Sequence, residues 1–148
     1  MFQIRPMTEG DLKEVLAIEV ACYSTPWKCE HFQDEIAARY SLPYVAVEEG
    51  RIVGYVCLMS LFEEAQILNI AVSPSRRGSG VARLLMNKAI SLALEQGADV
   101  MALEVRASND AAISMYEQFG FTRVGLRAGY YESVEDAILM EKTLKEIR

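Results

Sequence analysis

Two glycines and three arginines lie close together near the middle of the chain, within residues 76–83. Gly78 and Gly80 stand between an apolar, strand-like run over residues 67–72 and a long amphipathic segment that is predicted to be helical. Glycines at a strand-to-helix turn let the backbone approach a ligand closely and leave N–H groups pointing outward. The positive end of the helix dipole adds to the local field, so phosphate oxygens are the expected occupants.

The spacing of these residues distinguishes between classes of phosphate ligand. The G-x-x-x-x-G-K-[ST] pattern of nucleoside-triphosphate loops is absent. A dinucleotide fingerprint would begin at Gly78 and Gly80, but Arg83 stands at the position of its third glycine. The stretch instead fits R/Q-x-x-G-x-G/A through Arg77, Gly80 and Ala82. A helix start that merely contains two glycines is the alternative interpretation.

Three further side chains have positions that suit chemistry. Glu104 lies in the otherwise apolar run 101–105, where burial of a carboxylate is costly and raises its pKa. Tyr116 shares the apolar face of a later predicted helix and could protonate a leaving group. A solvent-facing glutamate and a core tyrosine are the alternatives. Asn109 fits the N-cap of that helix, a role compatible with a hydrogen bond to a ligand.

The cysteines and the single histidine, His31, do not indicate a metal centre. Cys22, Cys29 and Cys57 form no C-x-x-C pair, and together with one histidine they are too few for a structural zinc site. A Cys29–His31 nucleophile pair lacks an orienting group nearby. We therefore expect no metal, and we expect the cysteines to act as small hydrophobic residues.

Periodicity predicts the elements that must position these residues. The predicted strands cover residues 2–5, 44–47, 52–59, 65–72, 99–105, 121–126 and 137–144, and the predicted helices cover residues 12–20, 28–38, 79–96 and 110–118. The helix after the glycines is expected to bury Val81, Leu84, Leu85, Ala89, Leu92 and Ala93. The order β-α-α-β-β-β-α-β-α-β-β implies an α/β fold with one mixed sheet and helices on both faces.

Length and charge narrow the class of protein further. The chain has 148 residues, is 51% hydrophobic and carries a formal net charge of −6. These values predict one domain over residues 1–148 and disfavour direct binding to nucleic acid. No apolar run approaches a membrane span, and the first residues do not resemble a signal peptide. A cytoplasmic protein without membrane contact is the expectation.

Taken together, these motifs resemble the GNAT family of N-acetyltransferases, whose acyl-CoA signature is R/Q-x-x-G-x-G/A. The order of elements is also that of the GNAT fold, a mostly antiparallel mixed sheet of about seven strands, so the resemblance covers essentially the whole chain. Within the family, the chain is similar to the bacterial enzymes that acetylate the N-terminal alanine of a ribosomal protein. The segments that carry this similarity are 26–27, 69–72, 103–109, 111–113, 116–117, 120–121, 127–131, 135–137 and 140.

The resemblance implies acetyl-CoA as the cosubstrate and direct attack by an amine on its thioester. It implies that Glu104 is the general base, through water, and that Tyr116 is the general acid. The residues expected to contact acetyl-CoA are Ile70, Ala71, Val72, Arg77, Gly78, Ser79, Gly80, Val81, Ala82 and Asn109. Tyr130, Tyr131 and Glu135 are expected beside the acceptor.

The expected acceptor is the N-terminal amine of a small-subunit ribosomal protein, and the enzyme is expected to be a monomer or a weak homodimer. The chain departs from the family pattern at Thr25, where phenylalanine is common, and in a short loop before Glu135. Both places border the expected acceptor site. Acetylation of a lysine or a small amine, and a non-catalytic acyl-CoA-binding module, are the competing interpretations.

Overall fold

The computed structural model describes residues 1–131 and 135–145, with Tyr131 described by its backbone alone. Its elements are β1 Phe2–Pro6, the 3-10 helix η1 Glu9–Asp11, α1 Leu12–Cys22, α2 Cys29–Ala37, β2 Ser41–Glu48, β3 Arg51–Leu61, β4 Glu64–Val72, the 3-10 helix η2 Pro74–Arg76, α3 Val81–Glu95, β5 Val100–Arg106, α4 Asp110–Gln118, β6 Thr122–Tyr131 and β7 Glu135–Thr143. The predicted order of strands and longer helices is confirmed.

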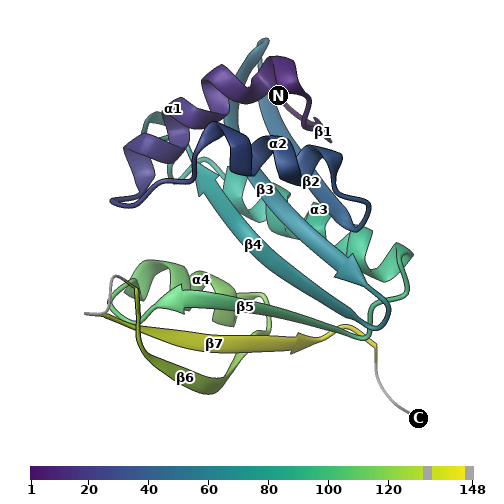
Figure 1. Ribbon diagram of the computed structural model, residues 1–148, viewed down its shortest axis with the longest axis vertical. Helices are drawn as coiled ribbons and strands as arrows, with labels where there is room; N and C mark the ends of the chain where they lie inside the picture. Colours follow the sequence, from purple (N-terminus) through teal and green to yellow (C-terminus); the bar gives the residue numbers. More distant parts are fainter. Residues whose placement is uncertain (132–134, 146–148) are drawn as a thin grey trace.

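One seven-stranded sheet runs through the molecule in the order β1-β2-β3-β4-β5-β7-β6. Neighbouring strands are antiparallel except for β4 and β5, which are parallel. The β7 strand therefore inserts between β5 and β6, its predecessor in the chain (Figure 1). The mixed, mostly antiparallel sheet agrees with the expectation from sequence.

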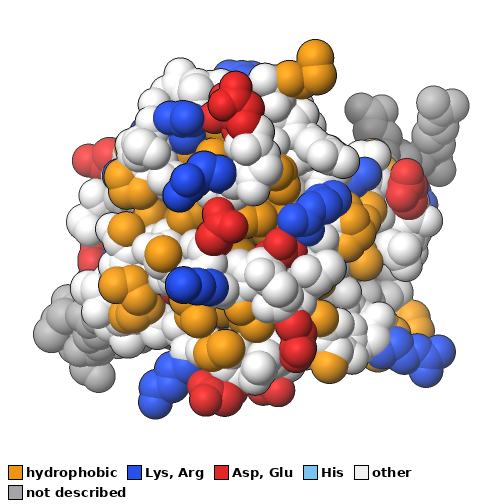
Figure 2. Space-filling view, turned by 90° about the horizontal axis from the view of Figure 1, so that it is seen from above, with side chains coloured by type: hydrophobic (Ala, Val, Ile, Leu, Met, Phe, Trp, Pro, Cys, Tyr) orange, Lys and Arg blue, Asp and Glu red, His pale blue; other side chains and the backbone are white. Residues whose placement is uncertain are grey.

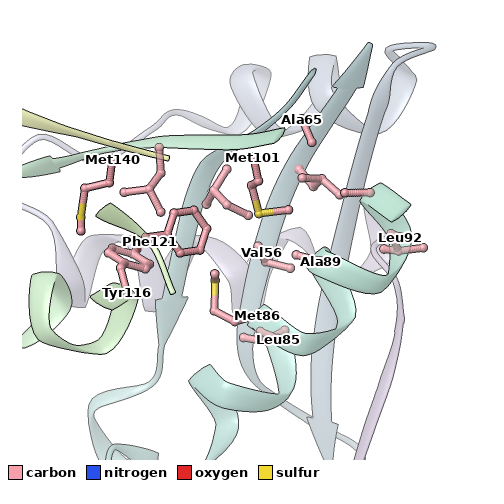
Figure 3. Packing of buried hydrophobic residues seen from close by; sticks show 14 of the residues in the cluster. Val56, Ala65, Leu85, Met86, Ala89, Leu92, Met101, Tyr116, Phe121 and Met140 are labelled. Atoms are coloured by element: carbon pink, nitrogen blue, oxygen red, sulfur yellow. The ribbon is translucent and has the colours of Figure 1, made fainter. Parts of the chain in front are cut away.

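Helices cover both faces of this sheet (Figure 1). On one face, α1 and α2 bury a cluster that includes Val15, Phe32 and Tyr55. On the other face, α3 and α4 bury a larger cluster in which Met86 and Met101 lie at the centre (Figure 3). Successive residues of a strand point to opposite sides of the sheet, so the two apolar layers determine which residues of each strand face α1 and α2 and which face α3 and α4.

One core prediction on α3 is wrong. Leu84 was expected inside, but it is 38% exposed, whereas Met86 is fully buried. At about 100° per residue, Leu84 and Met86 lie equally far to either side of the stripe through Val81, Leu85 and Ala89, and tertiary packing covers only the Met86 side. Leucine and methionine are both apolar, so composition alone could not separate the two positions.

The strands β4 and β5 pair only where they begin. Residues 64–66 of β4 pair with residues 100–102 of β5. Immediately afterwards, Cys57 of β3 lies opposite Asn69 while Leu58 lies opposite Ile67, which leaves Leu68 as an extra residue in β4. Such a bulge bends its strand and increases the local twist. The remainder of β4 consequently diverges from β5 (Figure 1).

The molecular surface carries charges of both signs. On the face drawn in Figure 2, Lys and Arg side chains alternate with Asp and Glu side chains, and apolar side chains lie between them. Among the described residues, every helix is too short or too polar to traverse a bilayer.

Candidate functional site

The turn between β4 and α3 forms the first wall of the candidate site. Gly78 has a φ of +81° and Gly80, the N-cap of α3, has a φ of +89°. A Cβ added at either glycine would meet no atom within 4 Å. The left-handed backbone, rather than lack of space, is therefore the reason for glycine at both positions. Because Gly80 is the cap, α3 begins at Val81, two residues after the predicted start near Ser79.

Backbone N–H groups at the start of α3 have no helical partner. The first helical bond runs from the Leu84 N–H to the Gly80 carbonyl, at 3.1 Å. The N–H groups that precede it point out of the helix end and suit an anion. A hollow of about 400 Å³ opens there, lined by Val72, Arg76, Arg77, Gly78, Gly80, Val81, Ala82, Arg83, Met115 and Phe119. The hollow thus connects the glycine turn with α4.

The arginines of this turn have different surroundings. Arg76 forms an ion pair with Glu48, so its charge is already balanced. Nη2 of Arg77 lies 3.4 Å from the sulfur of Cys22, and the guanidinium of Arg83 lies 5.7 Å from the centre of the Phe119 ring. Within the described residues, neither of these two arginines pairs with a carboxylate. They are the cations available to a phosphate group in the hollow.

The diverging half of β4 presents backbone groups towards β5. The N–H of Ser73 donates to β3 at 2.8 Å, and antiparallel ladders alternate the direction of successive backbone groups. Ile70 and Val72 therefore turn their N–H and carbonyl groups away from β3. In agreement, the Tyr23 phenol donates to the Ile70 carbonyl and the Cys22 thiol donates to the Val72 carbonyl at 3.4 Å. The N–H groups of both residues lie along the edge that faces the opening.

A buried carboxylate fixes this part of β4. Glu19 of α1 is 1% exposed. It accepts hydrogen bonds from the Asn69 amide at 2.8 Å, from the Trp27 backbone N–H at 2.8 Å and from the Tyr55 phenol. Burial, followed by the bond to Glu19, raises the pKa of Tyr55. Ala71 packs in the same cluster, so its side chain points away from the α3 side.

Glu104 lies on β5 two residues beyond the last residue paired with β4. Its neighbours Leu103 and Val105 face the core under α3 and α4, so the Glu104 carboxylate faces the opposite side. Oε1 of Glu104 lies 3.2 Å from Nη2 of Arg127, and Tyr130 also hydrogen-bonds to this carboxylate. That bond, with some burial, raises the pKa of the Tyr130 phenol. The Glu104 side chain is 19% exposed, so it is partly shielded from water.

Tyr116 reaches the same region from the other face. It is 6% exposed, and its ring lies edge-on to Phe121 with centroids 5.9 Å apart. Met101 and Met86 pack near it in the core beneath α3 and α4 (Figure 3). Glu104 and Tyr116 thus flank β5 from opposite sides. A reacting group would have to lie between the diverging strands to contact both.

The remaining predicted residues lie around the turn after β5. Oδ1 of Asn109 accepts a backbone N–H from the first turn of α4 at 3.2 Å, which confirms the predicted N-cap. The Glu135 carboxylate accepts a hydrogen bond from the backbone N–H of Ser108 at 2.8 Å and forms an ion pair with Arg106 at 3.1 Å. Hydrogen bonds from Ser108, more than the pairing with Arg106, lower the pKa of Glu135. The side chain of Tyr131, predicted beside the acceptor, lies outside the described residues, although its backbone pairs with Glu135.

Several residues at the site were not found from the sequence. The ion pair of Arg127 with Glu104 and the lining by Met115 and Phe119 depend on how separate elements pack. Glu19 did carry a signal, since a carboxylate on the apolar face of an amphipathic helix needs partners. All three cysteines are free thiols. In the part of the chain that the structure describes, His, Cys, Asp and Glu residues form no group suited to a metal ion.

Comparisons with known proteins agree with this geometry. The model of the acetyltransferase (GNAT) family matches residues 12–121. The chain is 33% identical over 143 residues to the ribosomal protein bS18-alanine N-acetyltransferase of Escherichia coli K12, covering 95% of this chain and 96% of that protein. A Bacillus subtilis protein, provisionally given the same name, is 34% identical over 145 residues, covering 97% and 96%. The crystal structure of the Escherichia coli ribosomal-protein-S18-alanine N-acetyltransferase has a TM-score of 0.92 at 30% identity, covering 100% of this chain and 97% of that one.

Proposed function

The chain belongs to the acetyltransferase (GNAT) family, and we propose that it transfers the acetyl group of acetyl-CoA to the N-terminal alanine of ribosomal protein bS18. One observation above all supports the proposal. The place where β4 diverges from β5 has the glycine turn, which suits an anion, on one side and the partly buried Glu104 carboxylate on the other. The names of the Escherichia coli relatives support the acceptor. Such a protein is an N-acetyltransferase that acts on a protein terminus.

The residues present fit acetyl-CoA, which supplies an acetyl group activated as a thioester. The N–H groups at the start of α3, with Arg77 and Arg83, would hold its diphosphate. The outward N–H groups of Ile70 and Val72 would hydrogen-bond the pantetheine arm, and Asn109, the N-cap of α4, would contact the cofactor. Positioning of this kind lowers the barrier by holding the reacting atoms together.

Glu104 would accept a proton from the acceptor ammonium, because only the neutral amine has a lone pair for attack. The new C–N bond would form as the C–S bond breaks, Tyr116 would donate its proton to the departing thiolate, and the second proton lost by the attacking nitrogen would restore the phenol. A backbone N–H near Val72 would stabilise charge on the carbonyl oxygen. An α-amino group has a pKa near 8, against about 10.4 for lysine, so its deprotonation costs roughly 3 kcal/mol less. A carboxylate base therefore favours an α-amine.

The experiment that tests this function uses peptides with the bS18 N-terminal sequence and an internal lysine. One peptide carries a free α-amine, and its twin carries a blocked one. After incubation with acetyl-CoA, mass spectrometry locates the added acetyl group. We expect acetylation of the first peptide at its α-amine and none of the second. Acetylation of the lysine, or of free polyamines in preference to either peptide, would contradict the proposed acceptor.

The base is tested by Glu104→Gln, with Glu141→Gln as the matched control. Glu141 lies on β7, is exposed, and lines the same shallow hollow of about 240 Å³ as Glu104. General-base catalysis contributes about 10²-fold to 10⁴-fold, so kcat of the Glu104 variant should fall by that factor while calorimetric affinity for CoA is retained. The control should keep its activity. Near-normal turnover of Glu104→Gln would remove this residue from the mechanism.

A further inference from the structure

Glu104, Arg127 and Tyr130 form a closed cluster of three side chains. The Glu104 carboxylate pairs with Nη2 of Arg127 at 3.2 Å and accepts a hydrogen bond from the Tyr130 phenol. The Arg127 guanidinium in turn stacks on the Tyr130 ring, with 4.6 Å between its central carbon and the ring centroid. The carboxylate that should receive the acceptor amine thus already has a cation beside it.

An irregularity in β6 brings both partners to the carboxylate. Residues three apart on a regular strand face opposite sides of the sheet, so Arg127 and Tyr130 would normally diverge. Here Arg127 lies opposite Ala137 and Tyr131 lies opposite Glu135, so three β6 residues face one β7 residue. Gly129, at the middle, has a φ of +61°, and its N–H donates to the β7 residue Asp136 at 2.9 Å. This bulge turns both side chains towards β5.

The members of the cluster differ in their freedom to move. The Arg127 side chain is 52% exposed, whereas the Glu104 side chain is 19% exposed. An exposed ion pair contributes little net stability, because water and salt compensate for its loss. The guanidinium can therefore leave while the carboxylate stays in place.

Resting on the function proposed above, we propose that Arg127 is a displaceable counter-ion of Glu104, whose place is taken by the α-ammonium of the acceptor. Both groups are cations that donate hydrogen bonds to a carboxylate. When the acceptor is absent, Arg127 holds the carboxylate in a fixed orientation. When the acceptor binds, Arg127 moves away into solvent and releases the base to the substrate.

The other charged groups around Glu104 do not supply a second cation within the described residues. Glu64 of β4 and Glu141 of β7 line the same hollow and are acidic. Arg106, on the same face of β5, is held by Glu135 at 3.1 Å. The competition for Glu104 is therefore between Arg127 and the incoming ammonium.

The test compares Arg127→Gln with Arg123→Gln, which removes the same charge from an exposed position of the same strand. The KM for the free-amine peptide should fall about twofold to fivefold in Arg127→Gln, the range expected for an exposed ion pair. The KM for acetyl-CoA and the inhibition constant of the N-acetylated, neutral peptide should stay unchanged. Arg127→Lys should resemble the parent protein, as should Arg123→Gln.

Three results would overturn the counter-ion role. They are a raised or unchanged acceptor KM in Arg127→Gln, an equal effect of Arg123→Gln, and an equal gain in affinity for the neutral peptide. A second comparison separates the counter-ion role of Arg127 from the base role of Glu104. Calorimetry measures the affinity of the free-amine peptide for Glu104→Gln and for the double variant that also carries Arg127→Gln. The counter-ion role requires equal affinities in that pair, whereas the base role is decided by the turnover of Glu104→Gln alone.

Discussion

Replacement of Gly80 by alanine tests the anion-binding turn without filling any space. The glycine has a φ of +89° and a ψ of 6°, and an added Cβ would meet nothing within 4 Å. The only penalty is the left-handed conformation, which costs an L-residue about 1–2 kcal/mol. The turn can relieve this strain by rotating the N–H groups at the start of α3 away from the ligand.

The matched control is Gly50→Ala in the hairpin between β2 and β3. Gly50 has a φ of +79°, and its added Cβ would also meet nothing within 4 Å. Both variants should lose about 1 kcal/mol of stability, which lowers Tm by about 2–4 °C in a domain of this size. Only Gly80→Ala should also lose CoA affinity, because binding of CoA would have to restore the strained backbone conformation. A cost of about 1–2 kcal/mol corresponds to a loss of about fivefold to thirtyfold in affinity.

Calorimetric titration with CoA and thermal unfolding of both variants provide the two readouts. If Gly80→Ala binds CoA as tightly as Gly50→Ala while both are destabilised, the start of α3 does not hold the diphosphate. The reasoning from backbone conformation to ligand would then be refuted, even though the stability prediction was correct.

Three further predictions follow from single contacts. Tyr116→Phe should lower kcat by about 10²-fold at unchanged acetyl-CoA affinity, because it removes only the phenolic hydroxyl group, and unchanged turnover in a steady-state assay would exclude an acid role. Glu19→Ala leaves three hydrogen-bond donors without an acceptor, and each buried donor without a partner costs about 1–3 kcal/mol. The free energy of unfolding measured in urea should therefore fall by about 3–5 kcal/mol, and by less in the control variant Glu14→Ala. The Arg5 guanidinium lowers the pKa of Asp11, so this pair stabilises the fold above about pH 4 and loses its effect as pH falls through the lowered pKa. Arg5→Gln should therefore cost about 1 kcal/mol at pH 7 and progressively less as the pH falls below about 4, and a cost that does not change with pH would show that the ion pair is not responsible.

Local patterns were sufficient to predict the order of elements. Glycines at positive φ end or begin elements at Gly50, Gly80 and Gly97, and each was recognised as a turn or helix boundary from its neighbours. Asn109 was recognised as a cap for the same reason, because capping involves residues only three apart. Such features depend on short-range backbone geometry, which sequence encodes directly.

Long-range features were not predictable in the same way. The extra residue Leu68 depends on how β4 pairs with β3, and the position of β7 between β5 and β6 depends on how the whole sheet assembles. The pairing of Glu104 with Arg127 also depends on the irregularity in β6, which no local pattern revealed. The sequence therefore supplied candidates for the chemistry, whereas packing determined their partners and the faces of the sheet that they occupy.

A crystal structure of the protein with acetyl-CoA tests the central claim most directly. We expect diphosphate oxygens within hydrogen-bond distance of the backbone N–H groups of residues 77–82, and the acetyl thioester between the diverging strands with Glu104 on one side and Tyr116 on the other. Acetyl-CoA bound elsewhere, or with its diphosphate turned away from the start of α3, would contradict the account.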